Sequence, residues 1–291
     1  MAKVHIFADS ISDIPKEWVE KYDIGIIPLY IVFQQKSYLD RIEITPQEMY
    51  NMVELYEELP KTAAPPPADF MKAFSPVIEN GEDILYISMS SHLSSTYQNA
   101  CSAAREFPPG RVTVVDSLNV SAGTAMHVLL AVQMAREGKS ALTIAQALEA
   151  VRHEVQLNVL VDNLDYLHRG GRVSSIQHML CSLLRIRPGL YIRDGQVHAG
   201  VKYRGSKDKV VNKLLNDMLS QIHRIDHAHV IIAQTLEEEK AVWVRNLIQE
   251  QTSIQHVHII EGGCSICSHS GPHSMAISYI LKSEPLVQGF R

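Results

Sequence analysis

A cluster of hydroxyl side chains follows a short apolar run in the stretch "YISMSSHLSSTYQNA", which covers Tyr86 to Ala100. A serine near a histidine can be a nucleophile with its base, a donor to a bound anion, or a helix cap. A nucleophile elbow needs the pattern G-x-S-x-G, and no glycine flanks these serines. The residues leave three interpretations open: an anion site, a capping loop, and a serine hydrolase with Ser94 as its nucleophile.

The elements on either side place this cluster at the edge of a sheet. The segment "DILYIS" predicts a strand, and "SSTYQNACSAAREF" predicts a helix. In open α/β sheets, ligands bind at the carboxyl ends of the strands. The unpaired amides and the dipole of the following helix favour an anion there. We therefore expect the cluster to cap a helix, to bind an anion, or to do both.

Two other segments carry side chains that could bind an anion. Thr62 lies in "PKTAAPPPADF", where prolines stiffen the chain and pre-position a hydroxyl, unless the segment is only a surface connection. Arg169 and Arg172 surround two glycines in "LHRGGRVSS", before a short predicted helix. Arginine pairs well with carboxylate or phosphate, and glycine lets backbone amides approach a ligand. A turn with solvated arginines is the alternative.

The segment "GGCSICSHSGPHS" contains Cys264, Cys267, His269 and His273 at a spacing that superficially suits zinc. We predict "CSIC" to be a terminal strand, whose alternation would put the two cysteines on opposite faces. Buried thiols are then the preferred interpretation, a zinc module is the alternative, and no metal is expected. His269, beyond the end of that strand, would lie at a sheet edge.

Four aspartates, Asp9, Asp13, Asp40 and Asp116, raise the alternative of a metal-assisted phosphatase. No pair of them has a metal-ligand spacing on one element. We interpret them as caps and strand-end turns, and we expect Asp13 to cap a helix that starts near Pro15.

Composition limits the class of protein. The chain has 291 residues, of which 46% are hydrophobic, four cysteines and a formal net charge of −5. The mild negative charge argues against nucleic acid as a partner. The N-terminal "MAKVHIFADS" lacks a signal-peptide core, and no run approaches the ~18 apolar residues of a membrane span. A soluble protein with a cytoplasmic location is expected.

The order of predicted elements indicates an α/β fold. Strands and helices alternate through residue 156, which predicts mostly parallel sheets with helices on both faces. Thr45 with Glu48 forms a capping box, and Ser140 starts another helix. Asp194-Gly195 predicts a β-hairpin in the second half. We predict two α/β domains: residues 1–156 together with a C-terminal helix at about 272–291, and residues 157–271 with the hairpin.

Taken together, these segments resemble the DegV family, the fatty-acid-binding subunits of bacterial fatty acid kinase. The resemblance covers essentially the whole chain. It is carried by "DSISDIP", "IPLYIVF", "SYLD", "PKTAAPPPADF", "ISMSSHLSSTYQNA", "VVDS", "LDYLHRGGRVS", "LLRIRPGLYIRDGQV", "KYRGSKDK" and "HSGPH". It implies two α/β domains that clasp an acyl chain. It also implies a non-catalytic protein that presents the fatty acid to a separate kinase, which makes an acyl phosphate for phospholipid synthesis.

The resemblance also implies a ligand and a site. Thr62 and Ser94 match the hydroxyls that bind the carboxylate, with Ser95, Arg172 and His269 in supporting places. The implied ligand is a long-chain fatty acid such as palmitate, stearate or oleate, and no cofactor is implied. The implied partners are the catalytic subunit of a fatty acid kinase and, transiently, a membrane; nucleic acid is not expected.

Three motifs depart from the usual family patterns. Ser95 stands in place of a glycine, and it is expected to alter the amide geometry next to Ser94. His273 and Ser274 replace small residues in "HSGPHS", and "KTAAP" replaces "TSQP" while keeping the threonine. These departures bear on the head-group contacts and on docking of the kinase.

Overall fold

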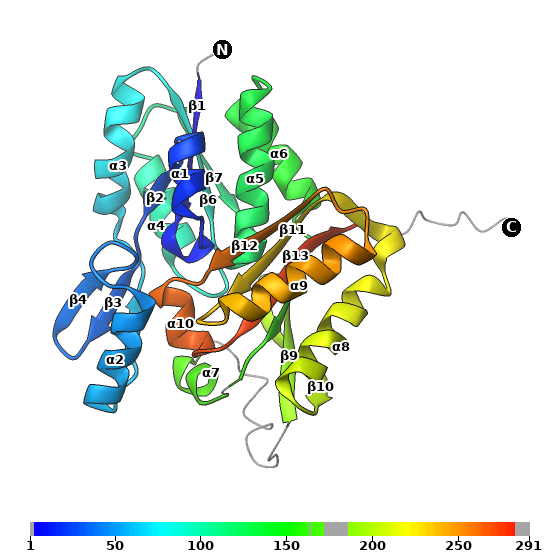
Figure 1. The fold of residues 1–291 in the computed structure, drawn as a ribbon. Coiled ribbons are helices and arrows are strands. Elements are labelled where there is room, and N and C mark those ends of the chain that lie inside the picture. The colour runs from blue at the N-terminus through cyan, green and yellow to red at the C-terminus, as the bar shows by residue number, and fades with distance from the viewer. Residues whose placement is uncertain (1–2, 163, 172–185, 283–291) are drawn as a thin grey trace, which may run out of the picture.

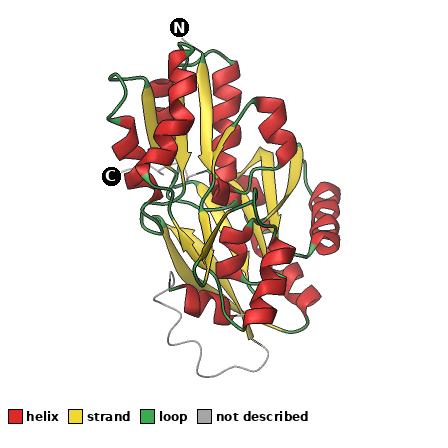
Figure 2. Ribbon diagram, turned by 90° about the vertical axis from the view of Figure 1, so that its left-hand side faces the viewer, coloured by secondary structure: helices red, strands yellow, loops and turns green. Residues whose placement is uncertain are grey.

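The computed structural model describes residues 3–162, 164–171 and 186–282, which form two large β-sheets, one small sheet and the helices around them (Figure 1). The mixed α/β class predicted from the sequence is confirmed. Figure 2 shows the helices covering the strands from both sides. In these described ranges, no helix is long and apolar enough to cross a membrane.

The first sheet is entirely parallel, as predicted, with the strand order β2-β1-β6-β7. Its strands are β1 (Val4–Asp9), β2 (Gly25–Ile27), β6 (Asp83–Ser88) and β7 (Val112–Asp116). The helices of this half of the chain are α1 (Lys16–Tyr22), α3 (Pro67–Glu79), α4 (Thr96–Ala104), α5 (Ala122–Arg136) and α6 (Ala141–Val151).

Both faces of the first sheet are apolar, because helices cover both. On one face, Phe7 and Tyr86 pack with Phe70 and Phe74 of α3. On the other face, alternate residues of the strands pack against α5 and α6. These residues are Ile6, Ala8, Leu85, Ile87 and Val115. This alternation is the period of two that a β-strand imposes.

The second sheet has six strands in the order β10-β9-β8-β13-β11-β12. They are β8 (Val155–Leu160), β9 (Ile186–Arg193), β10 (Gln196–Arg204), β11 (Ile225–Gln234), β12 (His256–Glu261) and β13 (Met275–Leu281). Only β11 and β12 pair in parallel; the other four pairs are antiparallel. The prediction of mostly parallel sheets therefore holds for the first sheet and is wrong for the second.

Two of the antiparallel pairs come from β13, which returns between β8 and β11 and runs against both, and the other two are β8–β9 and the β9–β10 hairpin. This strand also corrects the predicted C-terminal helix at about 272–291, because Met275–Leu281 is a strand and residues 283–291 lie outside the described ranges. Alternating residues of β13 pack on both faces of the sheet, a pattern a helix would not give. The domain division at residue 156 stays a prediction.

Helix α5 joins the two large sheets. Ten of its fifteen residues are buried, around the whole circumference of the helix, which is typical of a helix inside a core. It contacts β1 and β6 of the first sheet and β8, β11 and β13 of the second. Helices α8 (Lys207–Leu219) and α9 (Glu238–Gln251) cover the opposite face of the second sheet.

The small third sheet is antiparallel, with the order β4-β3-β5. Its strands are β3 (Tyr30–Phe33), β4 (Lys36–Leu39) and β5 (Lys61–Ala63), and its neighbours are α2 (Pro46–Tyr56) and α10 (Cys264–Ser270). Ile31 and Phe33 pack with both cysteines of α10.

Several local predictions are confirmed. The hydroxyl of Thr45 accepts a hydrogen bond from the Glu48 amide, and the Glu48 carboxylate accepts one from the Thr45 amide, which completes the capping box. Ser140 caps α6. Asp194 and Gly195 both have positive φ, 50° and 75°, as a tight hairpin between β9 and β10 requires.

Other local predictions are wrong. Asp13 is not the N-cap of α1; it has φ 55° and ends a 3₁₀ turn over Ser10–Ser12, while Pro15 precedes the helix. Helix α7 (Leu164–Gly170) is present in the structure and is not predicted from the sequence. The short helix predicted after the Gly-Gly loop falls on residues 172–185, outside the described ranges.

Because α5 is packed between both sheets, we expect Met126→Ala to lower the free energy of unfolding by about 2–5 kcal/mol. Met126 has 0% exposure. Met71→Ala, at a position with 37% exposure, is the control and should cost far less. Urea unfolding followed by circular dichroism measures both variants. Equal costs would show that α5 does not carry the shared core.

Candidate functional site

A cavity of about 390 Å³ lies between the second sheet and the loops at the carboxyl edge of the first. Most of its lining is aliphatic. The apolar side chains come from the loops (Ile11, Leu29, Met89, Leu93, Val120), from the second sheet (Leu157, Val159, Leu190, Ile192, Val197, Ala233, Met275, Ala276) and from Val161, Leu167 and Ile266. A long apolar ligand would find few polar partners along such walls.

Thr62 and His269 form a polar pair in the lining of this cavity, although they are far apart in the sequence. Thr62 lies in β5, where it pairs with Ile31 of β3, and its Oγ1 is 3.1 Å from Nε2 of His269 in α10. Both side chains are half-buried and line the cavity. The structure thus brings together two of the predicted site residues, which are 207 positions apart in the sequence.

Ser94 lines the same cavity from the turn before α4. Its Oγ accepts a hydrogen bond from the Thr96 amide at 3.2 Å and lies 2.8 Å from Oγ1 of Thr96. The serine therefore satisfies one of the free amides at the helix start, which is a capping role. Because Ser94 also lines the cavity, the structure places the predicted helix cap and the predicted anion-binding hydroxyl on the same residue.

Ser95 also lines the cavity, and its side chain is exposed. Its φ of −76° and ψ of 2° are accessible to any residue, so a serine is not strained at this position. No side-chain capping bond is formed by Ser95. The replacement therefore adds a hydroxyl at the cavity mouth without changing the backbone that the turn requires.

His92, the histidine of the serine-rich segment, is not placed to act as a base for Ser94. His92 is exposed, and its recorded hydrogen bond runs from its backbone amide to Ser90 Oγ at 3.2 Å. Among the described residues, no hydrogen bond joins the His92 ring to Ser94. Arg172, the fifth predicted site residue, lies outside the described ranges, and its role stays a prediction.

His269 is carried by helix α10, and this corrects the prediction of a strand for "CSIC". Two buried carboxylates hold the start of the helix. Oδ1 of Asp40 accepts from the Cys264 amide at 2.9 Å, and Oδ1 of Asp13 accepts from the Gly263 amide at 2.7 Å. Such acceptors satisfy the free amides of a first helical turn and complement its dipole.

The same two carboxylates bind other loops. Asp13 accepts a hydrogen bond from Ser121 Oγ at 2.5 Å, and Asp40 accepts one from Ser10 Oγ at 2.9 Å. Arg41 lies 3.5 Å from Asp13. The loops after β1 and β7 of the first sheet and the loop after β4 of the third sheet are thereby tied to the helix that carries His269.

Gly170 at the end of α7 approaches His269 so closely that a Cβ on it would lie 2.3 Å from Nδ1. At the other end of α10, Thr235 Oγ1 donates to the Gly271 carbonyl at 2.9 Å and accepts from the Ser274 amide at 2.8 Å. The imidazole is therefore positioned from three sides, by α7, by the end of β11 and by the capped helix start.

The two cysteines of α10 are buried. Cys264 Sγ donates to the Ile44 carbonyl and Cys267 Sγ to the Gly262 carbonyl, and burial raises the pKa of both thiols well above the usual range. Thiols in this state are poor metal ligands. In the described part of the chain, no group of three or more His, Cys, Asp or Glu residues is arranged to hold a metal ion.

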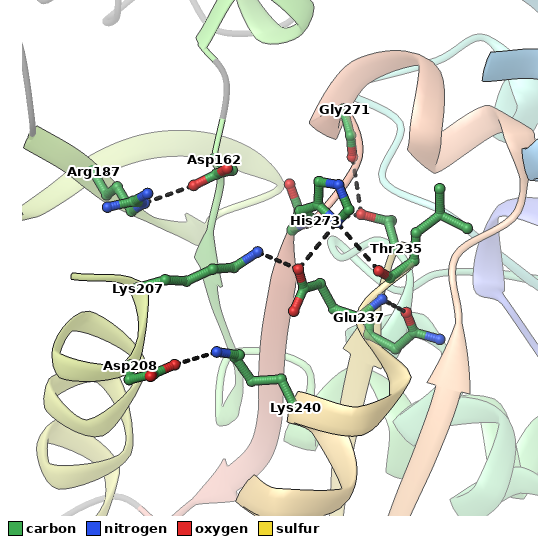
Figure 3. A network of polar contacts seen from close by, with 12 residues as sticks. Asp162, Arg187, Lys207, Asp208, Thr235, Glu237, Lys240, Gly271 and His273 are labelled. Carbon is green, nitrogen blue, oxygen red and sulfur yellow. Dashed lines mark hydrogen bonds and ion pairs between the residues drawn. The ribbon is translucent and has the colours of Figure 1, made fainter. Parts of the chain in front are cut away.

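His273 lies in the turn after α10 and has φ 62°, a conformation that favours glycine. Figure 3 shows its ring held by the end of β11: Nδ1 is 3.0 Å from Glu237 Oε1 and 3.2 Å from the Leu236 carbonyl oxygen. Glu237 also binds Lys207 at 2.5 Å. These contacts offset the strain of a non-glycine residue and form a charged surface beside the cavity.

The same view shows two further ion pairs, between Arg187 and Asp162 and between Lys240 and Asp208. They join β9 to the end of β8, and α9 to α8. Pairs at the surface contribute little stability individually, so their main effect is to order the charged side chains of this face.

A parallel sheet, a mixed sheet and an apolar cavity with a few hydroxyl and imidazole groups define a two-sheet α/β protein with a cavity between its sheets. Comparison with known proteins agrees. The family model described as "Uncharacterised protein, DegV family COG1307" matches residues 3–282. The chain belongs to the DegV family.

Individual relatives are similar over nearly their whole length. A DegV domain-containing protein of Clostridium perfringens is 31% identical over 280 residues, covering 96% of this chain and 99% of the relative.

Among solved structures, a DegV family protein of Thermus thermophilus described for its fatty acid binding has a TM-score of 0.89 and 30% identity, covering 96% of this chain and 99% of that one. A Thermotoga maritima protein described as revealing fatty acid binding function has a TM-score of 0.80 and 29% identity, covering 97% and 100%.

The aspartate at the end of β1 generates a prediction about pH. Asp9 has 0% exposure, and burial raises its pKa to about 7 against the hydrogen bonds from the Met89 amide and the Tyr86 hydroxyl. Between about pH 4 and pH 7 the folded protein thus holds a proton that the unfolded chain has lost. The contribution of this group to the free energy of unfolding therefore falls as the pH rises through this window.

Asp9→Asn cannot ionise, and its oxygen can take the place of Oδ2. We expect the variant to gain stability relative to the parent as the pH rises from 5 to 7, by on the order of 2 kcal/mol. Urea unfolding at both pH values measures the difference, with Asp23→Asn, whose side chain is 72% exposed, as the control. A difference that does not change with pH would show that Asp9 is ionised throughout.

Proposed function

We propose that this protein binds one long-chain fatty acid, such as palmitate, stearate or oleate, with its tail in the 390 Å³ cavity and its carboxylate at Thr62 and Ser94. The observation that carries the proposal is that the paired Thr62 and His269 line the same mostly aliphatic cavity as Ser94. The solved relatives from Thermus thermophilus and Thermotoga maritima, both described as fatty acid binding, support it.

The two hydroxyls are arranged to donate toward a ligand. If Nε2 of His269 carries the proton, it donates to Thr62 Oγ1, and the threonine proton is free to turn into the cavity. Ser94 Oγ accepts from the Thr96 amide, and if Thr96 Oγ1 also donates to it, the Ser94 proton is free to turn into the cavity. Each hydroxyl then passes on the polarisation of a donor behind it, which strengthens a hydrogen bond to a carboxylate.

The tail supplies most of the affinity. A 16-carbon chain buries about 14 methylenes at ~0.8 kcal/mol each, a gross driving force of about 11 kcal/mol before the costs of ordering and association. The carboxylate contributes orientation, because a charged group that is not hydrogen-bonded is costly to bury. The apolar walls of the cavity thus supply the affinity, and the hydroxyl groups set the orientation of the bound acid.

We propose further that the bound acid is presented to a separate fatty acid kinase, and that this chain does not itself catalyse the reaction. Ser95 beside Ser94 is exposed, and Thr62 and His269 are half-buried, so a carboxylate at these residues lies near the surface. A kinase could reach it there while the tail stays covered. The family resemblance supports this role, and Arg172 is proposed as a supporting residue on the same ground.

Replacing both hydroxyls tests the carboxylate site. Thr62→Ala combined with Ser94→Ala should weaken palmitate binding at least ten-fold, because each lost hydrogen bond to a charged group costs about 1.5–3 kcal/mol. Displacement of a fluorescent fatty acid measures the affinity. Ser102→Ala is the control, since its hydroxyl is exposed and bonds to the Gln98 carbonyl of its own helix. Equal affinities of all three proteins would remove Thr62 and Ser94 from the site.

The serine hydrolase alternative makes the opposite chemical prediction. A nucleophilic Ser94 would react covalently with a fluorophosphonate, and the label would disappear in Ser94→Ala. Because the Ser94 hydroxyl is bonded to Thr96 and not to His92, we expect no labelling. Intact-protein mass spectrometry after incubation with the probe decides between the two, and an adduct on Ser94 would overturn the non-catalytic proposal.

A further inference from the structure

A second cavity, of about 270 Å³, lies between the C-terminal end of α6 and the tip of the β9–β10 hairpin. Unlike the acyl cavity, it has charged walls. Its charged side chains are Arg152, His153, Arg193 and Asp194, and Leu118 and Ile192 are apolar neighbours.

Arg152 is the least exposed of the charged residues that line this cavity. It follows the last residue of α6 and is partly buried. Its Nε has almost no solvent contact, and within residues 3–162, 164–171 and 186–282 nothing accepts a hydrogen bond from it. A buried donor on a charged group without an acceptor is costly and calls for an explanation. An anion in the cavity would supply that acceptor.

The other charged groups leave the cavity with an excess of positive charge. Arg193 also lines the cavity, and its guanidinium carbon lies 5.5 Å from the ring centre of Tyr191. The single lining carboxylate, Asp194, is 3.3 Å from Nδ1 of His153. Two arginines and a histidine thus line the cavity together with one carboxylate.

The hairpin tip that carries Arg193 is fixed in place by the serine cluster of the first sheet. Ser90 Oγ donates to the Gly195 carbonyl at 2.7 Å. Gly195 has φ 75°, and a Cβ on it would lie 2.5 Å from Ser90 Oγ, so the close contact requires glycine. Arg193 and Arg152, from different halves of the chain, are therefore held on one cavity in a defined arrangement.

We propose that this cavity binds a phosphoryl group, carried either by a small free phosphate or by the head group of an anionic phospholipid. Two guanidinium forks offer more donors than the two oxygens of a carboxylate can use, whereas a phosphoryl group presents three or four oxygens. The site is separate from the acyl cavity, although Ile192 lines both. The inference therefore does not rest on the binding of a fatty acid.

Two probes separate the sources of the phosphoryl group. Inorganic phosphate is titrated into the full chain by calorimetry at constant ionic strength, and vesicles of phosphatidylglycerol or of phosphatidylcholine are tested by co-sedimentation. Saturable binding of inorganic phosphate assigns the site to free phosphates. Binding to phosphatidylglycerol vesicles but not to phosphatidylcholine vesicles, without binding of inorganic phosphate, assigns it to a lipid head group.

In either case Arg152→Gln and Arg193→Gln should each weaken binding roughly ten-fold or more. Arg105→Gln, which removes an exposed arginine at the end of α4, should leave it unchanged. Arg193 is exposed, so its variant tests the site even if Arg152→Gln is unstable. The proposal is overturned if neither probe binds, if the control loses as much affinity as the site variants, or if acetate competes as well as phosphate.

Discussion

The candidate site depends on two buried carboxylates at the start of a short helix. Asp13 and Asp40 accept hydrogen bonds from the amides of Gly263 and Cys264, which begin the helix that carries His269. A seven-residue helix has little stability of its own, so its place is set by what holds its ends. Because both aspartates come from loops of the N-terminal half, the imidazole and the Thr62 hydroxyl meet only when the two halves of the chain are assembled.

This dependence explains which parts of the structure the sequence could predict. The capping box at Thr45, the cap at Ser140 and the Asp194-Gly195 turn are local, since every group involved lies within a few residues, and all three were predicted correctly. The parallel sheet follows from the strand–helix rhythm of residues 4–151. These features need no information about distant parts of the chain.

The wrong predictions concern long-range partners. The segment "CSIC" contains no local helix signal, because the acceptors that hold its first turn are 224 and 250 positions away. In the same way, β13 pairs with β8 more than a hundred residues earlier, and this insertion contributes two of the four antiparallel pairs of the second sheet. Of the site residues, Thr62, Ser94 and His269 could be named from motifs, whereas Asp13 and Asp40 were taken for ordinary caps and turns.

The serine motif now has separate roles for its members. Ser90 fixes the hairpin tip, Ser94 caps α4 while lining the cavity, and Ser95 adds an exposed hydroxyl on an unstrained backbone. One loop of the first sheet therefore contributes to the 390 Å³ cavity and also braces the hairpin tip at the 270 Å³ cavity. The proposed function requires one direction of the bound acyl chain, with its carboxylate at the Thr62 and Ser94 hydroxyls and its tail along the second sheet.

A crystal structure of the protein with palmitate measures that direction. The account predicts electron density for one acyl chain in the 390 Å³ cavity, with both Thr62 Oγ1 and Ser94 Oγ within hydrogen-bond distance of the carboxylate. A chain bound in the reverse direction, with its carboxylate away from these hydroxyls, or an empty cavity at saturating palmitate, would contradict it.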